Sequence, residues 1–304
     1  MKKNLTGVLS LTRFNEYAYF VIVTTLLGIA AADGVFGWRF LIVLIANWLA
    51  VGFAFMINDV EDAPDDALSE NKTKRNPVSA GIISPQLAKI TSFVAAFLAA
   101  VLYGTLGLWP FIFGLFGLVL GYIYSYRGIR LKTIAFFDLI SHCLMLAGLQ
   151  FVCAYFSFTS QLNEKWLFPF LFVVCISIYG ELFNEIRDLE DDRKAQLRHT
   201  AIVLGERASH ILMLVVLSIG SISGAISFFF IQLIPFWVII LMAWLAVLFI
   251  LPPVLKMRHS HSSIEIQAPL HKPLERAAAL ALLLQFILPW IAQVLNIQAS
   301  NWFI

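Results

Sequence analysis

Uninterrupted apolar stretches dominate the chain, without the alternation of apolar and polar positions that marks a half-buried strand. They recur nine times, at approximately 17–37, 40–57, 87–106, 108–126, 134–157, 166–183, 208–231, 233–256 and 277–297. Each is close to the roughly 20 residues that a helix needs to cross a bilayer. In lipid only helices and closed barrels satisfy every backbone hydrogen bond, and continuous apolar runs favour helices. The pattern therefore predicts an all-α, multi-pass integral membrane protein with nine transmembrane helices.

The composition agrees with this prediction. Of the 304 residues, 60% are hydrophobic and 13% are charged, whereas soluble domains have about 45–50% and about 25%. These proportions exclude an ordinary water-soluble enzyme, a disordered chain and a small cysteine-stapled domain. The three cysteines, Cys143, Cys153 and Cys175, fall inside predicted spans without metal-like spacing. We interpret them as apolar packing residues.

Basic residues are concentrated on alternate connections between the predicted spans. Nineteen of the 21 Lys and Arg residues lie on one side, and only Arg39 and Lys165 lie on the other. Cytoplasmic loops carry the excess of Lys and Arg in membrane proteins. We therefore expect a cytoplasmic N-terminus and a C-terminus on the opposite side.

Acidic residues gather in two short windows. The first holds Asp59, Glu61, Asp62, Asp65, Asp66 and Glu70, and the second holds Glu181, Glu185, Asp188, Glu190, Asp191 and Asp192. Each window follows a predicted span on the cytoplasmic side, where clustered carboxylates repel one another and a bound cation would offset the repulsion. Oxygen-only ligands favour Mg²⁺ or Ca²⁺, and Mg²⁺ in particular combines a few carboxylates with substrate phosphate oxygens. The sequence therefore predicts a metal–phosphate site at the cytoplasmic membrane surface.

The two windows also resemble each other. Asn, Asp and Asp recur at positions i, i+4 and i+8, as Asn58, Asp62 and Asp66 and, 126 residues later, as Asn184, Asp188 and Asp192. This spacing places each trio on one face of a helix, although Pro64 disfavours helix just before Asp66. The repeat predicts one domain, 1–304, made of two related four-helix units, about 17–130 and 134–258, plus a ninth helix.

Basic side chains follow each acidic window and the fourth predicted span. The candidates for diphosphate binding are Lys72, Arg75, Arg130, Lys132 and Arg193. Diphosphate recognition would use such a mixture, because carboxylates hold a metal while Lys and Arg contact phosphate oxygens directly. The alternative is that these charges only orient the chain. For Arg75, Arg130 and Lys132 we favour diphosphate binding.

At these residues the sequence resembles the UbiA superfamily of intramembrane prenyltransferases. The first family motif, N-D-x-x-D-x-x-x-D, is matched by Asn58, Asp59, Asp62 and Asp66, and the second, N-x-x-R-D-x-E-x-D-R, by Asn184, Arg187, Asp188, Glu190, Asp192 and Arg193. Tyr124-Ser125 with Arg130-Leu131-Lys132 resembles the family's segment after the fourth helix. The chain departs from the family where Asn76 separates Arg75 from Pro77.

The resemblance implies Mg²⁺-dependent transfer of an isoprenyl group from a prenyl diphosphate to a lipophilic acceptor within the membrane, by ionisation of the allylic diphosphate. It implies that the catalytic residues are Asp62, Asp66, Asp188 and Asp192, and that the metal is bound by these four with Asn58, Asp59 and Asn184. The implied partners are the donor, the acceptor and the bilayer, with no nucleic acid. No residue selects the acceptor or the length of the donor.

Two alternatives stay open. An intramembrane terpene cyclase of the same superfamily would use the same aspartates but quench the cation internally. A secondary transporter also combines repeated halves with acidic membrane sites, but its coupling residues lie near the bilayer midplane. Both acidic windows here instead follow the ends of spans, which favours the prenyltransferase.

Several side chains are weaker candidates for a substrate or cation pocket: Tyr124, Tyr126, Asp138, His142 and Tyr179. The three tyrosines lie near the cytoplasmic ends of their spans, where an aromatic face can stabilise a cation. Asp138 and His142 are unusual at membrane depth, and they either hold or deprotonate an acceptor or form a helix-packing hydrogen bond. Asn47, in the middle of a span, we interpret as an interhelical hydrogen-bonding residue.

Overall fold

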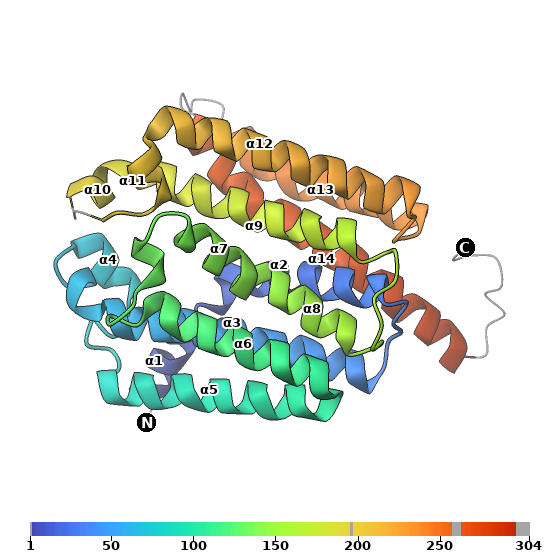
Figure 1. Ribbon diagram of the computed structural model, residues 1–304, viewed down its shortest axis with the longest axis horizontal. Coiled ribbons are helices and arrows are strands. Elements are labelled where there is room, and N and C mark those ends of the chain that lie inside the picture. Colours follow the sequence, from blue (N-terminus) through green and yellow to red (C-terminus); the bar gives the residue numbers. More distant parts are fainter. Residues whose placement is uncertain (1, 195–196, 257–262, 296–304) are drawn as a thin grey trace.

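The computed structural model describes residues 2–194, 197–256 and 263–295, and these residues form helices and no strands (Figure 1). Nine helical segments of this described part are long and apolar enough to cross a membrane, which confirms the nine predicted spans. They are α2 (Phe14–Ala31), α3 (Trp38–Asp66), α5 (Pro85–Leu106), α6 (Leu108–Ser125), α7 (Phe137–Cys143) continued by η2 (Leu144–Gly148) and α8 (Leu149–Phe156), α9 (Leu167–Arg187), α12 (Glu206–Ala225) continued by η3 (Ile226–Phe230), α13 (Phe236–Lys256) and α14 (Ser263–Val294). The predicted boundary at 296–297 lies outside the described residues.

Five short elements lie outside these spans: α1 (Lys2–Thr12), α4 (Glu70–Arg75), η1 (Leu131–Thr133), α10 (Leu189–Lys194) and α11 (Thr200–Leu204). Figure 1 shows α4, α10 and α11 together at the left-hand end of the elongated bundle. The connections that carry the acidic windows therefore share one end of the molecule.

Both acidic windows extend helices beyond the apolar stretches, because hydropathy marks where the lipid ends rather than where the helix ends. α3 continues through Pro64 to Asp66, so the interruption that proline was expected to cause does not occur. α9 instead ends at Arg187, and α10 begins after Asp188. The expected face of the second trio is thus divided between two helices, although i→i−4 backbone hydrogen bonds of 3.0 Å join Asp188 to Asn184 and Asp192 to Asp188.

The connections between α4, α5 and α6 show how local sequence sets the helix ends. Ser84 caps α5, since its hydroxyl accepts a 3.3 Å hydrogen bond from the Leu87 N–H, and Pro85 occupies the first helical position, which has no need of an N–H. Gly107 separates α5 from α6 with φ of +130°, a conformation that other residues rarely adopt. These signals produce a helical hairpin of α5 and α6.

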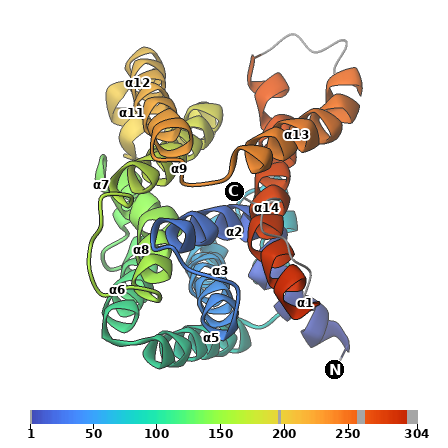
Figure 2. The same ribbon diagram turned by 90° about the vertical axis from the view of Figure 1, so that its right-hand side faces the viewer.

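The helices pack around α2. Figure 2, which looks along the bundle, shows α13 and α14 on one side of α2 and α9 and α12 on another, with α5 at the periphery. α2 contacts α3, α8, α9 and α14, and α13 packs mainly against α14. Two thirds of the apolar window of α2 is buried, whereas 6% of that of α13 is buried, as expected of a helix that faces lipid.

A buried polar network joins four of these segments at Asn47 of α3. The Asn47 amide N–H₂ donates to the hydroxyl of Thr25 at 2.8 Å and to the carbonyl of Gln150 at 3.0 Å, and its oxygen accepts from the hydroxyl of Tyr103 at 2.7 Å. The three partners belong to α2, α8 and α5. The interpretation of Asn47 as an interhelical hydrogen-bonding residue is confirmed. The three cysteines are likewise free and buried, as expected of packing residues.

We expect the substitution Asn47→Leu to lower the free energy of unfolding by about 1–2 kcal/mol, because it leaves three buried polar groups without their partner. Thermal unfolding in detergent measures the loss. The matched control is Ser218→Ala on α12, which removes an exposed hydroxyl that donates to the Leu214 carbonyl of its own helix. Equal stability of Asn47→Leu and the wild type would show that the network does not hold the helices together.

Candidate functional site

The two acidic windows meet at one end of the bundle. The first occupies the last turns of α3, the second spans the end of α9 and α10, and α4 lies at the same end (Figure 1). Lys72 of α4 links them, because its Nζ lies 3.9 Å from Oδ1 of Asp192. Residues that are 120 positions apart in the sequence therefore belong to one charged surface.

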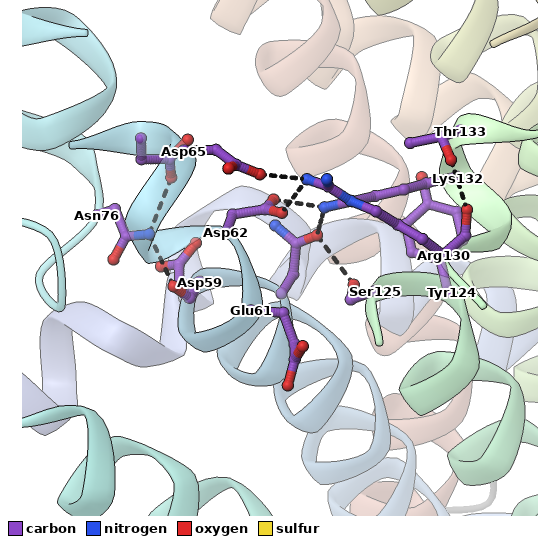
Figure 3. Close-up of polar contacts among 12 residues, drawn as sticks. Asp59, Glu61, Asp62, Asp65, Asn76, Tyr124, Ser125, Arg130, Lys132 and Thr133 are labelled. Atoms are coloured by element: carbon purple, nitrogen blue, oxygen red, sulfur yellow. Dashed lines mark hydrogen bonds and ion pairs between the residues drawn. The ribbon is translucent and has the colours of Figure 1, made fainter. Parts of the chain in front are cut away.

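Asp62 is the centre of the first window. One of its oxygens is 3.0 Å from the Arg130 guanidinium, and the other accepts a hydrogen bond from the Lys132 ammonium (Figure 3). Lys132 also donates to Oδ1 of Asn58 at 2.8 Å, and Ser125 donates to the same oxygen at 3.0 Å. The predicted metal-binding and diphosphate-binding residues of this window are thus in direct contact.

The backbone conformation after α6 positions the side chains of Arg130 and Lys132. Arg130 adopts a left-handed conformation, with φ of +52°, immediately before the turn η1 that carries Lys132. Burial lowers the pKa of the Lys132 ammonium, while the neighbouring Asp62 opposes that effect. Burial would also lower the pKa of the Arg130 guanidinium, but Asp62 and Asp65 outweigh it, so that pKa is raised. Asp62 is held between two cations that would otherwise be costly to bury.

The partners of Asp59 and Asp66 differ from those of Asp62. Asp59 is buried, and its Oδ1 lies 3.1 Å from the guanidinium of Arg13, the left-handed residue between α1 and α2. Asp66 accepts a 2.8 Å hydrogen bond from the amide of Asn76. Arg75, which we predicted to bind diphosphate, is paired with Glu16 at 2.5 Å.

Asn76 itself is a structural member of the site that the sequence presented only as a departure from the family. It is buried, its amide N–H₂ also donates to the Asp59 carbonyl at 2.8 Å, and its oxygen accepts from the N–H groups of Val78 and Ser79. Asparagine often bonds the backbone two residues further on in such turns. The Asn76-Pro77 pair was therefore the signal in the sequence that could have indicated this structural role.

The second window is more open. Asp188 pairs with its neighbour Arg187 at 2.8 Å and is half exposed, and both Asn184 and Arg193 are exposed. Asp192 is more enclosed, because Nε2 of the buried His199 lies 3.1 Å from its Oδ2. Burial would lower the pKa of His199, but the adjacent carboxylates of Asp192 and Glu185 raise it to about 10.

His199 also belongs to a buried cluster with two carboxylates. Its members Asp138, Glu185 and His199 offer ligand atoms within 4.8 Å of one another. The two carboxylates already have partners: Asp138 accepts from the backbone N–H and the hydroxyl of Thr200, and Glu185 accepts from the Ala201 N–H at 2.9 Å. The cluster therefore fastens α11 to α7 and α9, and it holds His199 against Asp192.

The weaker pocket candidates divide into separate groups. Tyr124 donates to Glu181 at 3.1 Å, and His142 lies 3.3 Å from the other oxygen of Glu181. Tyr126 stacks on Tyr122, and Tyr179 makes an edge contact with His271. His142 and Asp138, four residues apart, do not share partners, since Asp138 is taken by Thr200.

In a comparison with protein families, residues 21–265 match the UbiA prenyltransferase family. A digeranylgeranylglyceryl phosphate synthase from Sulfolobus acidocaldarius is 27% identical over 192 residues, which cover 62% of this chain and 66% of the relative. A 4-hydroxybenzoate octaprenyltransferase from Blochmanniella pennsylvanica is 27% identical over 218 residues, which cover 68% of this chain and 72% of the relative. The chain thus spans about two thirds of the length of these curated relatives.

Solved structures share the fold. A UbiA homologue from Archaeoglobus fulgidus bound to DMAPP and Mg²⁺ superposes with a TM-score of 0.68 at 18% identity, over 91% of this chain and 96% of that one. The apo structure of a UbiA homologue from Aeropyrum pernix gives 0.67 at 15% identity, over 90% and 98%. At these identities the likeness establishes the helical architecture.

Proposed function

Because the chain belongs to the UbiA prenyltransferase family, we propose that it transfers an isoprenyl group from a prenyl diphosphate to a lipophilic acceptor within the membrane. In this reaction the carbon–oxygen bond between the allylic carbon and the diphosphate breaks, and the acceptor captures the allylic carbon. The names of the two curated relatives support prenyl transfer as the reaction class.

One observation carries the proposal. Asp62 is enclosed by Lys132 and Arg130 at the end of the bundle where Lys72 reaches Asp192. A diphosphate site needs carboxylates to hold a metal and cations to contact phosphate oxygens. Both kinds of group gather here, next to helices that offer an apolar environment for an isoprenoid tail.

Magnesium fits the side chains that are present. The proposed ligands are Asn58, Asp59, Asp62, Asp66, Asn184, Asp188 and Asp192, and all of them can present oxygen atoms, which Mg²⁺ prefers. The buried Oδ2 of Asp59 has no hydrogen-bond partner among the described residues, so a donor or a cation would be favourable there. Bound Mg²⁺ would stabilise the negative charge that develops on the leaving diphosphate.

The basic side chains of the chain itself would bind and orient the donor. Lys132 and Arg130, which neutralise Asp62, would contact phosphate oxygens when a metal satisfies that carboxylate. Lys72 and Arg75 of α4 and Arg193 of α10 lie at the same end and would add further contacts to the donor. Tyr124, Tyr126 and Tyr179 would offer aromatic faces to the allylic cation.

We propose that this end of the bundle faces the cytoplasm, with the N-terminus on the same side. The excess of Lys and Arg on alternate connections supports that orientation. The diphosphate would then enter from the aqueous side, where soluble prenyl diphosphates are available. The acceptor would come from the apolar side.

The test is metal-dependent prenyl transfer by the purified protein in liposomes. With a prenyl diphosphate and a lipid acceptor extract, we expect product formation in Mg²⁺ and a loss of at least about 100-fold in EDTA, restored by excess Mg²⁺. Undiminished transfer in EDTA would contradict the proposal. A cyclic hydrocarbon or cyclic terpene alcohol formed from the donor alone would identify a terpene cyclase instead.

A further inference from the structure

A second polar cluster lies further into the bundle than the acidic motifs. Glu181 precedes Asn184 by three residues in α9, which places it about 4.5 Å closer to the middle of that helix. Tyr124 precedes Ser125, whose hydroxyl donates to Asn58 at 3.0 Å. The cluster therefore lies about one helical turn below the proposed diphosphate, on the side where the isoprenoid chain must extend.

Glu181 is held by donors from two other helices. The Tyr124 hydroxyl of α6 donates to its Oε1 at 3.1 Å, and Nε2 of His142 in α7 lies 3.3 Å from its Oε2. Nδ1 of His142 lies 3.5 Å from the hydroxyl of Ser177. Because each carboxylate oxygen can accept two hydrogen bonds and has one partner among the described residues, each can accept one more.

This cluster differs from the buried networks that serve packing. Asn47 and Asp138 are at most 1% exposed, whereas the side chains of Glu181 and His142 are 16% and 15% exposed. In addition, α7 gives way to the π-helical turn η2 two residues after His142, a distortion that is frequent at functional sites. An ionisable group at this depth is costly unless it is used.

We propose that Glu181, positioned by Tyr124 and His142, accepts the proton of a hydroxyl group on the prenyl acceptor. This step rests on the proposed function. The allylic carbon–oxygen bond breaks and the diphosphate leaves with its electron pair. A lone pair of the acceptor oxygen forms the new carbon–oxygen bond, the electrons of the O–H bond stay on that oxygen, and the proton passes to a Glu181 oxygen.

The surroundings of Glu181 favour an uncharged hydroxyl over a carboxylate-bearing acceptor. The helices that supply its partners, α6 and α7, and the continuing α8 contain no Lys or Arg. Glu181 interacts electrostatically with Glu185 and Arg187, and Arg187 is paired with Asp188. A hydroxyl can donate to Glu181 from the start of the reaction, whereas an aromatic ring carbon releases its proton only after the new bond has formed.

The variant Glu181→Gln separates proton acceptance from donor binding, because the amide keeps the shape and can still accept from Tyr124. We expect the prenylated lipid to fall by at least about 100-fold, while Mg²⁺-dependent release of diphosphate from geranylgeranyl diphosphate stays within about threefold of the wild type. The lipid is measured by mass spectrometry in source cells that lack the gene and are complemented with each form. Diphosphate release is measured on purified protein.

Each other outcome has a meaning. Wild-type levels of the lipid in Glu181→Gln would overturn the assignment of Glu181, as would a folded variant that no longer releases diphosphate. If the wild type neither releases diphosphate nor supports a lipid product, the proposed function itself fails. Cys175→Ser, six residues earlier in α9, is the matched control and should keep both signals.

His142 is tested as a positioning residue. His142→Leu should lower lipid formation by about tenfold with unchanged diphosphate release, and His142→Asn, which retains a side-chain N–H, should restore part of the loss. An equal deficit in both variants would indicate a packing role and contradict positioning.

Discussion

Asp188→Asn and Asp62→Asn are each expected to reduce prenyl transfer by at least about 1000-fold, which corresponds to about 4 kcal/mol of transition-state stabilisation. Each substitution removes one negative charge from the proposed metal ligands while it preserves the volume of the side chain. Asp62 is already balanced by Lys132 and Arg130, so its loss also leaves two cations in mutual repulsion. Transfer is measured in liposomes with saturating donor and Mg²⁺.

The matched control for these variants is Glu70→Gln. Glu70 belongs to the first acidic window, but its side chain is exposed, and its ion-pair partner among the described residues is Lys74 of its own helix α4. We expect this variant to retain activity within about twofold. Full activity of Asp62→Asn or Asp188→Asn in protein that remains monodisperse would contradict the metal-dependent mechanism.

Lys132→Met is expected to have opposite effects on the metal and on the donor. Without donor, Lys132 neutralises Asp62 and donates a hydrogen bond to the amide oxygen of Asn58, so its removal frees oxygen ligands and should strengthen the binding of Mg²⁺ alone. With donor, the loss of a charge-assisted contact to phosphate should raise KM and lower kcat/KM by about 100-fold. Calorimetric titration and steady-state kinetics measure the two effects.

A comparison with Lys74→Met sharpens this experiment, because Lys74 is an exposed lysine that pairs with Glu70 rather than with the proposed ligands. It should leave both quantities unchanged. If Lys132→Met weakens metal binding and donor binding equally, Lys132 stabilises the structure of the site and does not contact the donor.

The spans and the common end of the acidic windows were accessible from sequence because both depend on local composition. Apolar stretches must be about as long as the bilayer is thick, and every second span returns the chain to the same side. The sequence also predicted that Asp62, Lys132 and Arg130 lie on the same side, since each follows a span on that side. The relation between units 17–130 and 134–258 stays a prediction.

The partners of individual side chains were not accessible in the same way. His142 and Asp138 share a helical face, which suggested a joint role, but the backbone and hydroxyl of Thr200 take Asp138, and His142 reaches Glu181. The contact of Arg13 with Asp59 depends on a left-handed residue between α1 and α2. Such contacts are decided by how distant helices pack, and no local pattern encodes them.

The pairing of Asp62 with Arg130 and Lys132 has a consequence for how the protein is made. Its two cations come from 68 and 70 residues later in the chain. At about 5–20 residues per second, a ribosome needs roughly 3–14 s to reach them. For that interval the nascent chain carries Asp62 without either cation, and the charge balance of the site is completed only when the fourth span has been synthesised.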